Sequence, residues 1–291
     1  MRGVLIMALA GIVLSTGGPI IRQVEEASGF QIVFWRSIAQ SVLIFLILMV
    51  RERGGITKVF LGLGWPGISG SLFLSLAFFG YIFSITSTTV ANTLFLISTT
   101  PFFAAILAWP ILREKVSKPT WIAIMTASIG VMIMVSQGLS TGRLFGNVMG
   151  LFCALATALY IISVRYGSVR SGSTDMVPVV CVSGLIAALI AVIIEGGNIW
   201  ISTNDLFWCV VAGAVQNGPG FMLFTMGSRY IPAAELSLLG LIEVIIGPIW
   251  MWLLLSEIPD MYTLAGGGVV LVAVSGLAFW SLYRFGSGPG K

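Results

Sequence analysis

The sequence contains very little charge. Of its 291 residues only 9% are charged and 57% are hydrophobic, whereas roughly 25% of an ordinary soluble domain is charged. The mean hydropathy is +1.03, and 15 basic and 11 acidic residues cannot coat a soluble globule of 31.0 kDa. These values exclude a soluble enzyme, a nucleic-acid-binding protein and a disordered protein. They favour a polytopic membrane protein.

Histidine is absent altogether, which excludes histidine-based general bases, metal sites and proton relays. The cysteines are few and scattered: Cys153, Cys181 and Cys209 each lie inside an apolar run. Their odd number and wide spacing argue against a disulfide framework or a metal site. We interpret all three cysteines as small, buried hydrophobic residues. We therefore expect no metal and no cofactor.

Long apolar runs are what the sequence does have. A bilayer core of about 30 Å needs about 20 apolar residues per helix, and ten runs meet this criterion. They cover 3–21, 28–50, 64–87, 90–112, 119–137, 146–167, 174–195, 204–228, 233–256 and 259–283. The first run has no clear small-residue cleavage site and is followed by nine others, so we interpret it as a membrane helix and not a signal peptide. Residues 286–291 are predicted to be a tail.

The loop charges predict an orientation. With the N-terminus inside, twelve of the 15 basic residues fall on the inner side. These are Arg2, Arg51, Arg53, Lys58, Arg113, Lys115, Lys118, Arg165, Arg170, Arg229, Arg284 and Lys291. The predicted outer loops hold most of the acidic residues: Glu25, Glu26, Glu195, Asp205, Glu257 and Asp260. The positive-inside rule then places both termini in the cytoplasm.

The chain also repeats itself. A shift of 143 residues aligns Ala91 with Ala234 and Trp109 with Trp252 without a gap. Because each half has an odd number of helices, five, the second half must enter the membrane inverted. The loop charges agree: the basic loop around Arg113 has no positive charge in the second copy. We predict two repeats, 1–139 and 146–285, around a central cavity. An inverted five-plus-five repeat is a transporter architecture.

Short motifs carry a family resemblance. Leu-Arg-Glu-Lys at 112–115 and Leu-Ser-Glu-Ile at 255–258 each close the fourth helix of a half, and Phe34-Trp35-Arg36 and Leu241-Ile242-Glu243 also fit. The chain resembles the EamA-type branch of the drug/metabolite transporter superfamily over about residues 3–283. Among its members it looks most like bacterial inner-membrane exporters of aromatic and other neutral amino acids. That likeness implies a multi-pass protein of the bacterial inner membrane, and a monomer is plausible.

Helix-bending residues mark where a transport site could form. Pro19, Pro101, Pro219 and Pro248 interrupt predicted helices 1, 4, 8 and 9. Proline frees backbone carbonyls, which must then face protein or water. The sequence Gln-Asn-Gly-Pro-Gly at 216–220 is either a structural kink or a break that lines the cavity. We favour the second, because amide side chains are costly in lipid.

Polar and aromatic residues near these bends are the candidates for binding. The hydroxyls of helix 4 could bind cargo, or they could bond their own backbone and join helices. The aromatic side chains could stack on a flat ring, or fill the core. As a group, with little charge nearby, they favour a neutral and partly apolar substrate. The candidate substrate-binding residues are Phe78, Tyr81, Asn92, Thr93, Leu96, Thr99, Thr100, Gln216, Asn217, Phe221 and Phe224.

Two charges fall deep inside apolar runs. Arg36 lies ~12 Å from the outer side and Glu243 ~15 Å from the inner side, at 1.5 Å per residue, so both are near the midplane. A lone charge there costs at least a few kcal/mol and needs a partner or a wet cavity. Either the two form a structural ion pair, or Glu243 is a carboxylate that exchanges protons.

These features predict a secondary transporter that exports small metabolites by alternating access. Aromatic and other neutral amino acids are the expected cargo, and another metabolite or a drug is the alternative within the same fold. No GxxxxGK[ST] motif is present, so ATP on this chain does not supply the energy. A membrane-embedded enzyme is the rival, but Ser–His and HExxH chemistry both need the missing histidine. The expected partners are a small molecule and the lipid bilayer, not nucleic acid.

Overall fold

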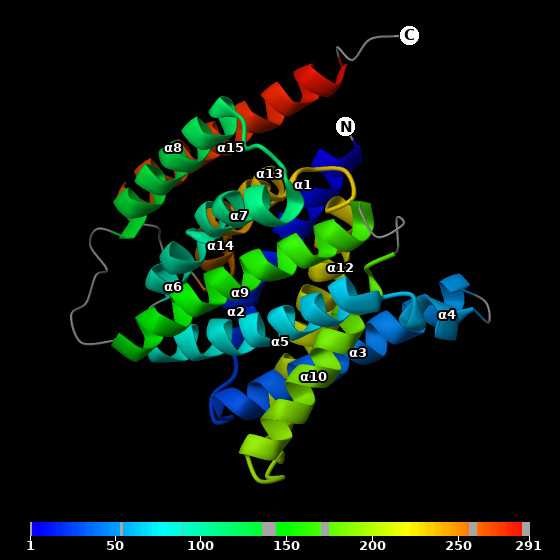
Figure 1. The fold of residues 1–291 in the computed structure, drawn as a ribbon. Coiled ribbons are helices and arrows are strands. Elements are labelled where there is room, and N and C mark those ends of the chain that lie inside the picture. The colour runs from blue at the N-terminus through cyan, green and yellow to red at the C-terminus, as the bar shows by residue number, and fades with distance from the viewer. Residues whose placement is uncertain are drawn as a thin grey trace.

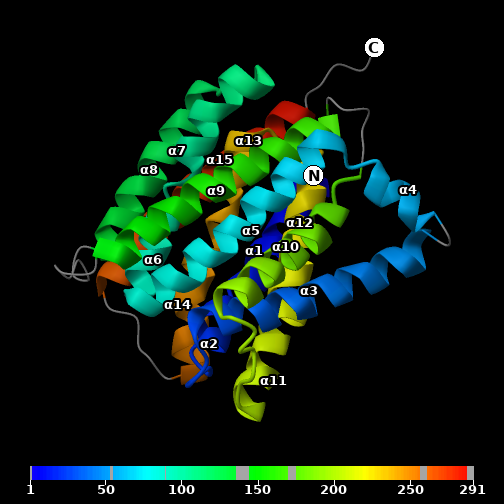
Figure 2. The ribbon, with the colours of Figure 1, turned by 60° about the horizontal axis from the view of Figure 1, so that its bottom comes forward.

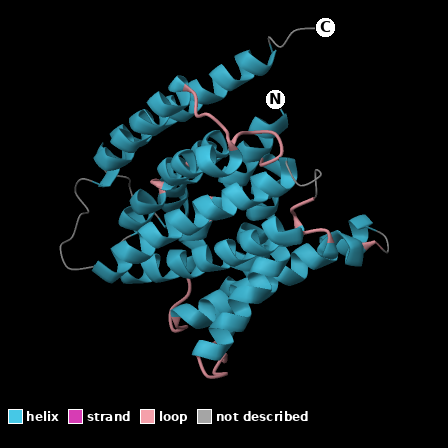
Figure 3. Cartoon of the chain, in the orientation of Figure 1, coloured by secondary structure: helices cyan, strands magenta, loops and turns pink. Residues whose placement is uncertain are grey.

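The computed structural model describes residues 2–52, 55–88, 90–135, 144–169, 175–255 and 261–286. Every regular element within these ranges is a helix (Figure 3). In the first half the helices are α1 (Arg2–Leu14), α2 (Gly17–Ile21), α3 (Gly29–Glu52), α4 (Ile56–Leu61), α5 (Gly64–Ser87), α6 (Val90–Ile97), α7 (Thr100–Leu107), η1 (Ala108–Leu112) and α8 (Lys118–Val135). In the second half they are α9 (Leu144–Val169), α10 (Pro178–Ile194), α11 (Thr203–Val211), η2 (Ala212–Asn217), α12 (Gly218–Gly227), α13 (Ala233–Gly240), α14 (Ile242–Leu255) and α15 (Met261–Gly286).

Within the described ranges, six helical segments are long and apolar enough to cross a membrane: Arg2–Ile21, Gly29–Glu52, Gly64–Ser87, Leu144–Val169, Thr203–Gly227 and Ala233–Leu254. Four shorter apolar helices occupy the remaining predicted runs: Thr100–Leu112, Lys118–Ile133, Pro178–Ile194 and Leu264–Leu277. Large apolar side chains stay exposed on the outside of the bundle, among them Leu46, Ile106 and Leu189. A hydrophobic outer surface is what lipid requires, so the predicted multi-pass, all-helical membrane fold is confirmed for the described ranges.

Several of these segments are broken within their length. The predicted run 3–21 stops being helical between α1 and α2. Run 90–112, the fourth, does so at Ser98 and Thr99 between α6 and α7, and run 233–256, the ninth, at Leu241 between α13 and α14. Position 98 corresponds to position 241 under the 143-residue repeat. The eighth segment widens into the π-helical turn η2 before Pro219. Helical bonding continues through Pro248 within α14, so the break in that segment lies seven residues earlier.

Helices from the two halves pack in corresponding pairs. α3 packs along α10, α8 along α15, and α7 against α13. These are the second, fifth and fourth segments of one half beside the second, fifth and fourth of the other. Figures 1 and 2 show α8 and α15 side by side at one edge of the molecule. Each of these contacts joins segments from the two stretches 2–135 and 144–286.

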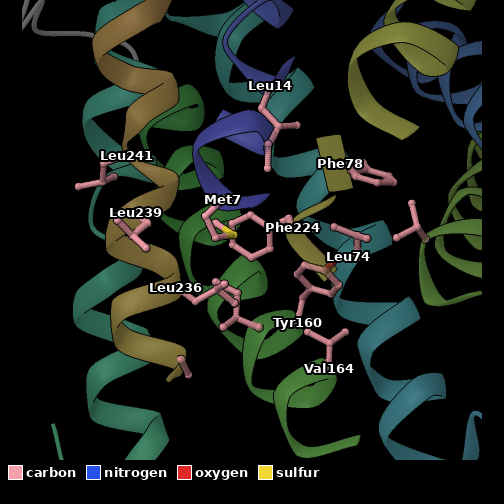
Figure 4. Close-up of a cluster of buried hydrophobic side chains, with 14 of the residues drawn as sticks. Met7, Leu14, Leu74, Phe78, Tyr160, Val164, Phe224, Leu236, Leu239 and Leu241 are labelled. Carbon is pink, nitrogen blue, oxygen red and sulfur yellow. The ribbon is translucent and has the colours of Figure 1, made fainter. Parts of the chain in front are cut away.

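The interhelical contacts are close because small residues lie at them. α5 and α9 form the most extensive contact, and a Cβ at Gly80 would fall 2.9 Å from the backbone nitrogen of Cys153. A large apolar cluster fills much of the space between the helices, with Met7, Leu14 and Leu74 among its buried members (Figure 4). The polar side chains inside the bundle therefore stand out.

Charged loop residues gather in two separate groups. On the side where α1 begins, the Arg165 Nε donates to the Glu114 carboxylate at 2.8 Å, and the backbone nitrogen of Ala233 donates to the same carboxylate at 3.1 Å. Gly3 packs there against Tyr230. At the other end of the bundle, the Asp205 carboxylate accepts from the backbone nitrogens of residues 25, 26 and 27 at 2.9–3.1 Å. The sequence reasoning did not identify either contact.

Candidate functional site

Arg36 is the most deeply buried charged residue at the candidate site. α3 carries it inside the bundle, where its side chain is 2% exposed. Its guanidinium carbon lies 5.1 Å from the centre of the Phe78 ring and 5.7 Å from that of Tyr81, both on α5. Within the part of the chain that the structure describes, its Nε and Nη2 have no hydrogen-bond partner. The charge is thus flanked by aromatic rings, and no described residue forms an ion pair with it.

Tyr81 and Gln216 approach each other at Gly17. A Cβ at Gly17 would lie 2.9 Å from the Gln216 Nε2 and 3.4 Å from the Tyr81 hydroxyl, so only glycine leaves room for both. Gln216 donates from Nε2 to the Leu14 carbonyl at 3.2 Å. Its Oε1 is buried and accepts no hydrogen bond from any described residue. The break after α1, the widened turn η2 and α5 therefore meet at one place.

Four aromatic rings gather beside this place. The Phe221 ring lies 5.5 Å from Phe78 and 5.9 Å from Tyr160, both edge-on, and 6.3 Å from Phe224. Figure 4 shows Phe78, Tyr160 and Phe224 together between α5, α9 and α12. The Tyr160 hydroxyl lies 2.5 Å from Thr225 Oγ1. Sequence reasoning predicted three of these rings, and an aromatic residue near the middle of an apolar run was the only signal for Tyr160.

Asn217 makes a different contact from Gln216. Its Nδ2 donates to the Oε1 of Gln40, and the Gln40 Nε2 donates to the Val180 carbonyl at 2.6 Å. All of these groups are buried. The amide pair therefore joins η2 to α3 and α10. Gln40 was not predicted, although an amide in an apolar run signals a required partner.

The predicted residues of the fourth segment are used mainly in packing. Thr93 Oγ1 lies 2.9 Å from Ser84 Oγ of α5. Thr99 and Thr100 each donate to a carbonyl three residues earlier, at 2.6 Å. Leu96 is buried against Gly150 of α9. The side chain of Asn92 lies outside what the structure describes. Thr93 therefore joins α6 to α5, and Thr99 and Thr100 bond their own backbone.

Glu243 lies in the first turn of α14, directly after the break at Leu241, and is partly exposed. Ile242 beside it packs on Gly11 of α1. Among the described residues no ion pair joins Glu243 to Arg36. Arg36 lies instead against the rings of Phe78 and Tyr81. Of the two alternatives for these charges, the direct ion pair is therefore not formed among the described residues.

The bending residues lie at or near the same breaks. Pro19 lies in α2, Pro101 starts α7, and Pro219 starts α12. Of the sequence-predicted set, the structure brings Phe78, Tyr81, Gln216, Phe221 and Phe224 close to Arg36 or to one another. The threonines lie instead at the contacts between α6 or α7 and its neighbours.

Comparison with known proteins places the chain in a family. The sequence pattern of the EamA-like transporter family matches twice, over residues 1–136 and 144–279. The chain belongs to the EamA-like transporter family. The pseudopaline exporter CntI of Pseudomonas aeruginosa is 23% identical to this transporter over 282 residues, which cover 95% of each chain. Human solute carrier family 35 member G1 is 22% identical over 301 residues, which cover 97% of this transporter and 80% of the human protein.

Two further similarities agree with this family assignment. An uncharacterized transporter of Archaeoglobus fulgidus is 23% identical over 281 residues, which cover 92% of this transporter and 93% of the relative. A solved crystal structure shares the fold, with a TM-score of 0.78 over 96% of this transporter and 98% of the other chain, at 13% identity. The family and the named relatives are transporters and not enzymes, so small-molecule transport across a membrane is the class of activity.

Proposed function

We propose that this transporter exports aromatic and other neutral amino acids by alternating access. The observation that carries the proposal is the interior group of Phe78, Tyr160, Phe221 and Phe224 beside a single buried cation and an amide with an unused acceptor. Aromatic rings stack on flat or apolar cargo. One cation and one acceptor suit a molecule with few charges. Export, and not uptake, is supported by the likeness to a relative named as an exporter.

The proposed architecture is ten crossings in two inverted repeats, 1–139 and 146–285, around a central substrate cavity. The pairing of α3 with α10 and of α8 with α15 supports it. The two groups of charged loop residues support cytoplasmic termini, because Glu114, Arg165 and the start of α1 lie at one end and Asp205 at the other. A bacterial inner membrane fits the same orientation. Rocking of one half against the other would expose the site to each side in turn.

This architecture predicts that Ser117 and position 260 face opposite sides of the membrane. Single cysteines at the two positions, in a background without Cys153, Cys181 and Cys209, should react with a membrane-impermeant maleimide from different sides. Both single-cysteine proteins should be labelled fully after detergent permeabilisation, and the cysteine-free parent should stay unlabelled, which is the control for accessibility. Reaction of both positions from the same side contradicts the inverted repeat.

The cargo assignment predicts a selective effect of Tyr81→Ala. Removal of the ring that borders Arg36 and Gln216 should weaken counterflow of aromatic amino acids about 2- to 10-fold, because an aromatic contact beyond simple burial contributes roughly 0.5–1.5 kcal/mol. Counterflow of alanine should change much less. The measurement is uptake of labelled phenylalanine and alanine into preloaded proteoliposomes.

The matched control is Tyr166→Ala, since Tyr166 is more than one third exposed on α9 and lies outside the ring group. It should leave both cargoes unaffected. Equal losses of phenylalanine and alanine in Tyr81→Ala would remove the support for a cargo-binding ring. A transporter that moves only polycations or phosphorylated sugars would overturn the cargo assignment itself.

A further inference from the structure

We propose that the guanidinium of Arg36 binds the carboxylate of the cargo. The inference deepens the proposed function and rests on it for the identity of the cargo. It assigns a specific binding role to Arg36, which the sequence identified only as a charge inside the membrane.

The first argument is that the charge lacks a partner. A buried guanidinium in a bilayer needs an anion or a set of hydrogen-bond acceptors. Arg36 is 2% exposed, and in the described ranges its Nε and Nη2 donate to nothing. Phe78 and Tyr81 present ring faces to it, which attract the cation but do not replace a hydrogen-bond acceptor. The missing acceptor has to come from outside the described protein.

The second argument is the geometry of the two unused donors. Nε–H and Nη2–H lie on the same edge of the planar guanidinium and point in the same direction. That edge matches the two oxygens of one carboxylate, which arginine binds through two parallel hydrogen bonds. A single cation neutralises a carboxylate, whereas a phosphate would keep part of its charge uncompensated in the bilayer. The chemistry of the site therefore favours a carboxylate.

The third argument is the acceptor nearby. Gln216 Oε1 is buried and unused, and the same side chain meets Tyr81 beside Gly17. An ammonium group has hydrogen-bond donors but no acceptor, so the ammonium of the cargo would donate a hydrogen bond to this oxygen. Two unused donors and one unused acceptor around Tyr81 thus match the two ends of a zwitterion. The aromatic rings of Phe78 and Phe221 would then contact the cargo side chain.

Binding of a matched ligand series tests the assignment. Affinities of purified transporter for phenylalanine, phenylalaninamide, phenethylamine and 3-phenylpropionate would be measured by calorimetry. Wild-type protein should prefer phenylalanine to its amide by about 10- to 100-fold, the range given by a hydrogen bond to a charged group. Arg36→Gln should weaken the binding of phenylalanine by the same factor and leave the affinity for phenylalaninamide nearly unchanged. Arg36→Lys keeps the charge without the planar edge, so its affinity for phenylalanine should lie between those of wild type and Arg36→Gln.

Arg51→Gln is the control, because it removes a guanidinium from the other end of α3, where Arg51 pairs with Glu52 and Asp175. It should change none of the four affinities. Thermal unfolding without ligand separates binding from structure. A binding role predicts that Arg36→Gln unfolds no earlier than wild type, because it removes an unpartnered buried charge.

The contrary results are equally defined. Equal weakening of phenylalanine and phenylalaninamide in Arg36→Gln, together with earlier unfolding, would make Arg36 structural. If that variant does not fold, the wild-type series decides, and equal affinity for the acid and the amide overturns the proposal. Arg36-dependent binding of 3-phenylpropionate but not phenylalanine would overturn the amino-acid cargo and keep the role of Arg36. Cargo without any carboxylate would overturn that role.

Discussion

A transporter that carries Glu243→Gln should lose proton-gradient-driven accumulation of cargo and keep counterflow. Glu243 is a partly exposed carboxylate directly after a helix break, and within the described part of the chain it has no ion pair with Arg36. Among the described residues, an ion pair with Arg36 is therefore not what holds Glu243 in place. Glutamine keeps its size and polarity but cannot release a proton. We expect gradient-driven accumulation to fall to the level of protein-free liposomes, with the melting temperature unchanged.

Two measurements on the same liposomes test this expectation. One is uptake of labelled cargo driven by an imposed pH gradient, and the other is exchange at equal pH on both sides. Glu52→Gln, the same substitution at the exposed end of α3, should affect neither. A Glu243→Gln protein with lower folded yield, rescued by Arg36→Gln in the same chain, would instead indicate a structural charge pair. Normal behaviour in all assays would leave Glu243 without an essential role.

The second large effect is expected at the amide pair between η2 and α3. Asn217→Leu removes the donor to Gln40 and leaves a buried amide oxygen without a partner in the membrane. An orphaned buried polar group costs about 1–3 kcal/mol. The protein should unfold earlier on heating. Because Gln216 precedes Asn217 in the same turn, cargo binding should weaken as well.

The double variant Gln40→Leu, Asn217→Leu separates the amide bond from simple packing. When both partners of a buried hydrogen bond are replaced by apolar groups, the net change in stability is small. We therefore expect the double variant to recover most of the thermal stability lost in Asn217→Leu. If the double variant is less stable than the single one, the leucine clashes and the amide pair is not the cause. Melting curves of wild type, Asn217→Leu and the double variant are sufficient.

Much of the fold could be predicted because its signals are local. Length and hydropathy located the apolar runs, and the Gly-Pro steps at Pro19 and Pro219 marked two real breaks. The break at Leu241, directly after Gly240, was not predicted, whereas the predicted bend at Pro248 lies within a continuous helix. A helix can end where its neighbours supply the packing, and that information is not in the local sequence.

The candidate site was predicted only in part, for a related reason. Depth along a helix follows from residue number, but the direction in which a side chain points depends on packing. Arg36 and Glu243 were placed at similar depth, with an ion pair between them as one of two alternatives, yet Arg36 contacts Phe78 and Tyr81 instead. The hydroxyls of Thr99 and Thr100 could have bound cargo or served in packing. Each donates to a backbone carbonyl three residues earlier in the same segment. Gln40 needed a partner 177 residues away, which no local pattern reveals.

Counterflow in proteoliposomes tests the central claim most directly. Liposomes that contain the purified protein and are preloaded with unlabelled phenylalanine should accumulate labelled phenylalanine transiently, and protein-free liposomes should not. Unlabelled tryptophan, tyrosine and leucine outside should compete, whereas spermidine and glucose 6-phosphate should not. Accumulation that depends on the protein and follows this order is the predicted result. Accumulation only with a polyamine or a phosphorylated sugar, and none with any amino acid, would contradict the account.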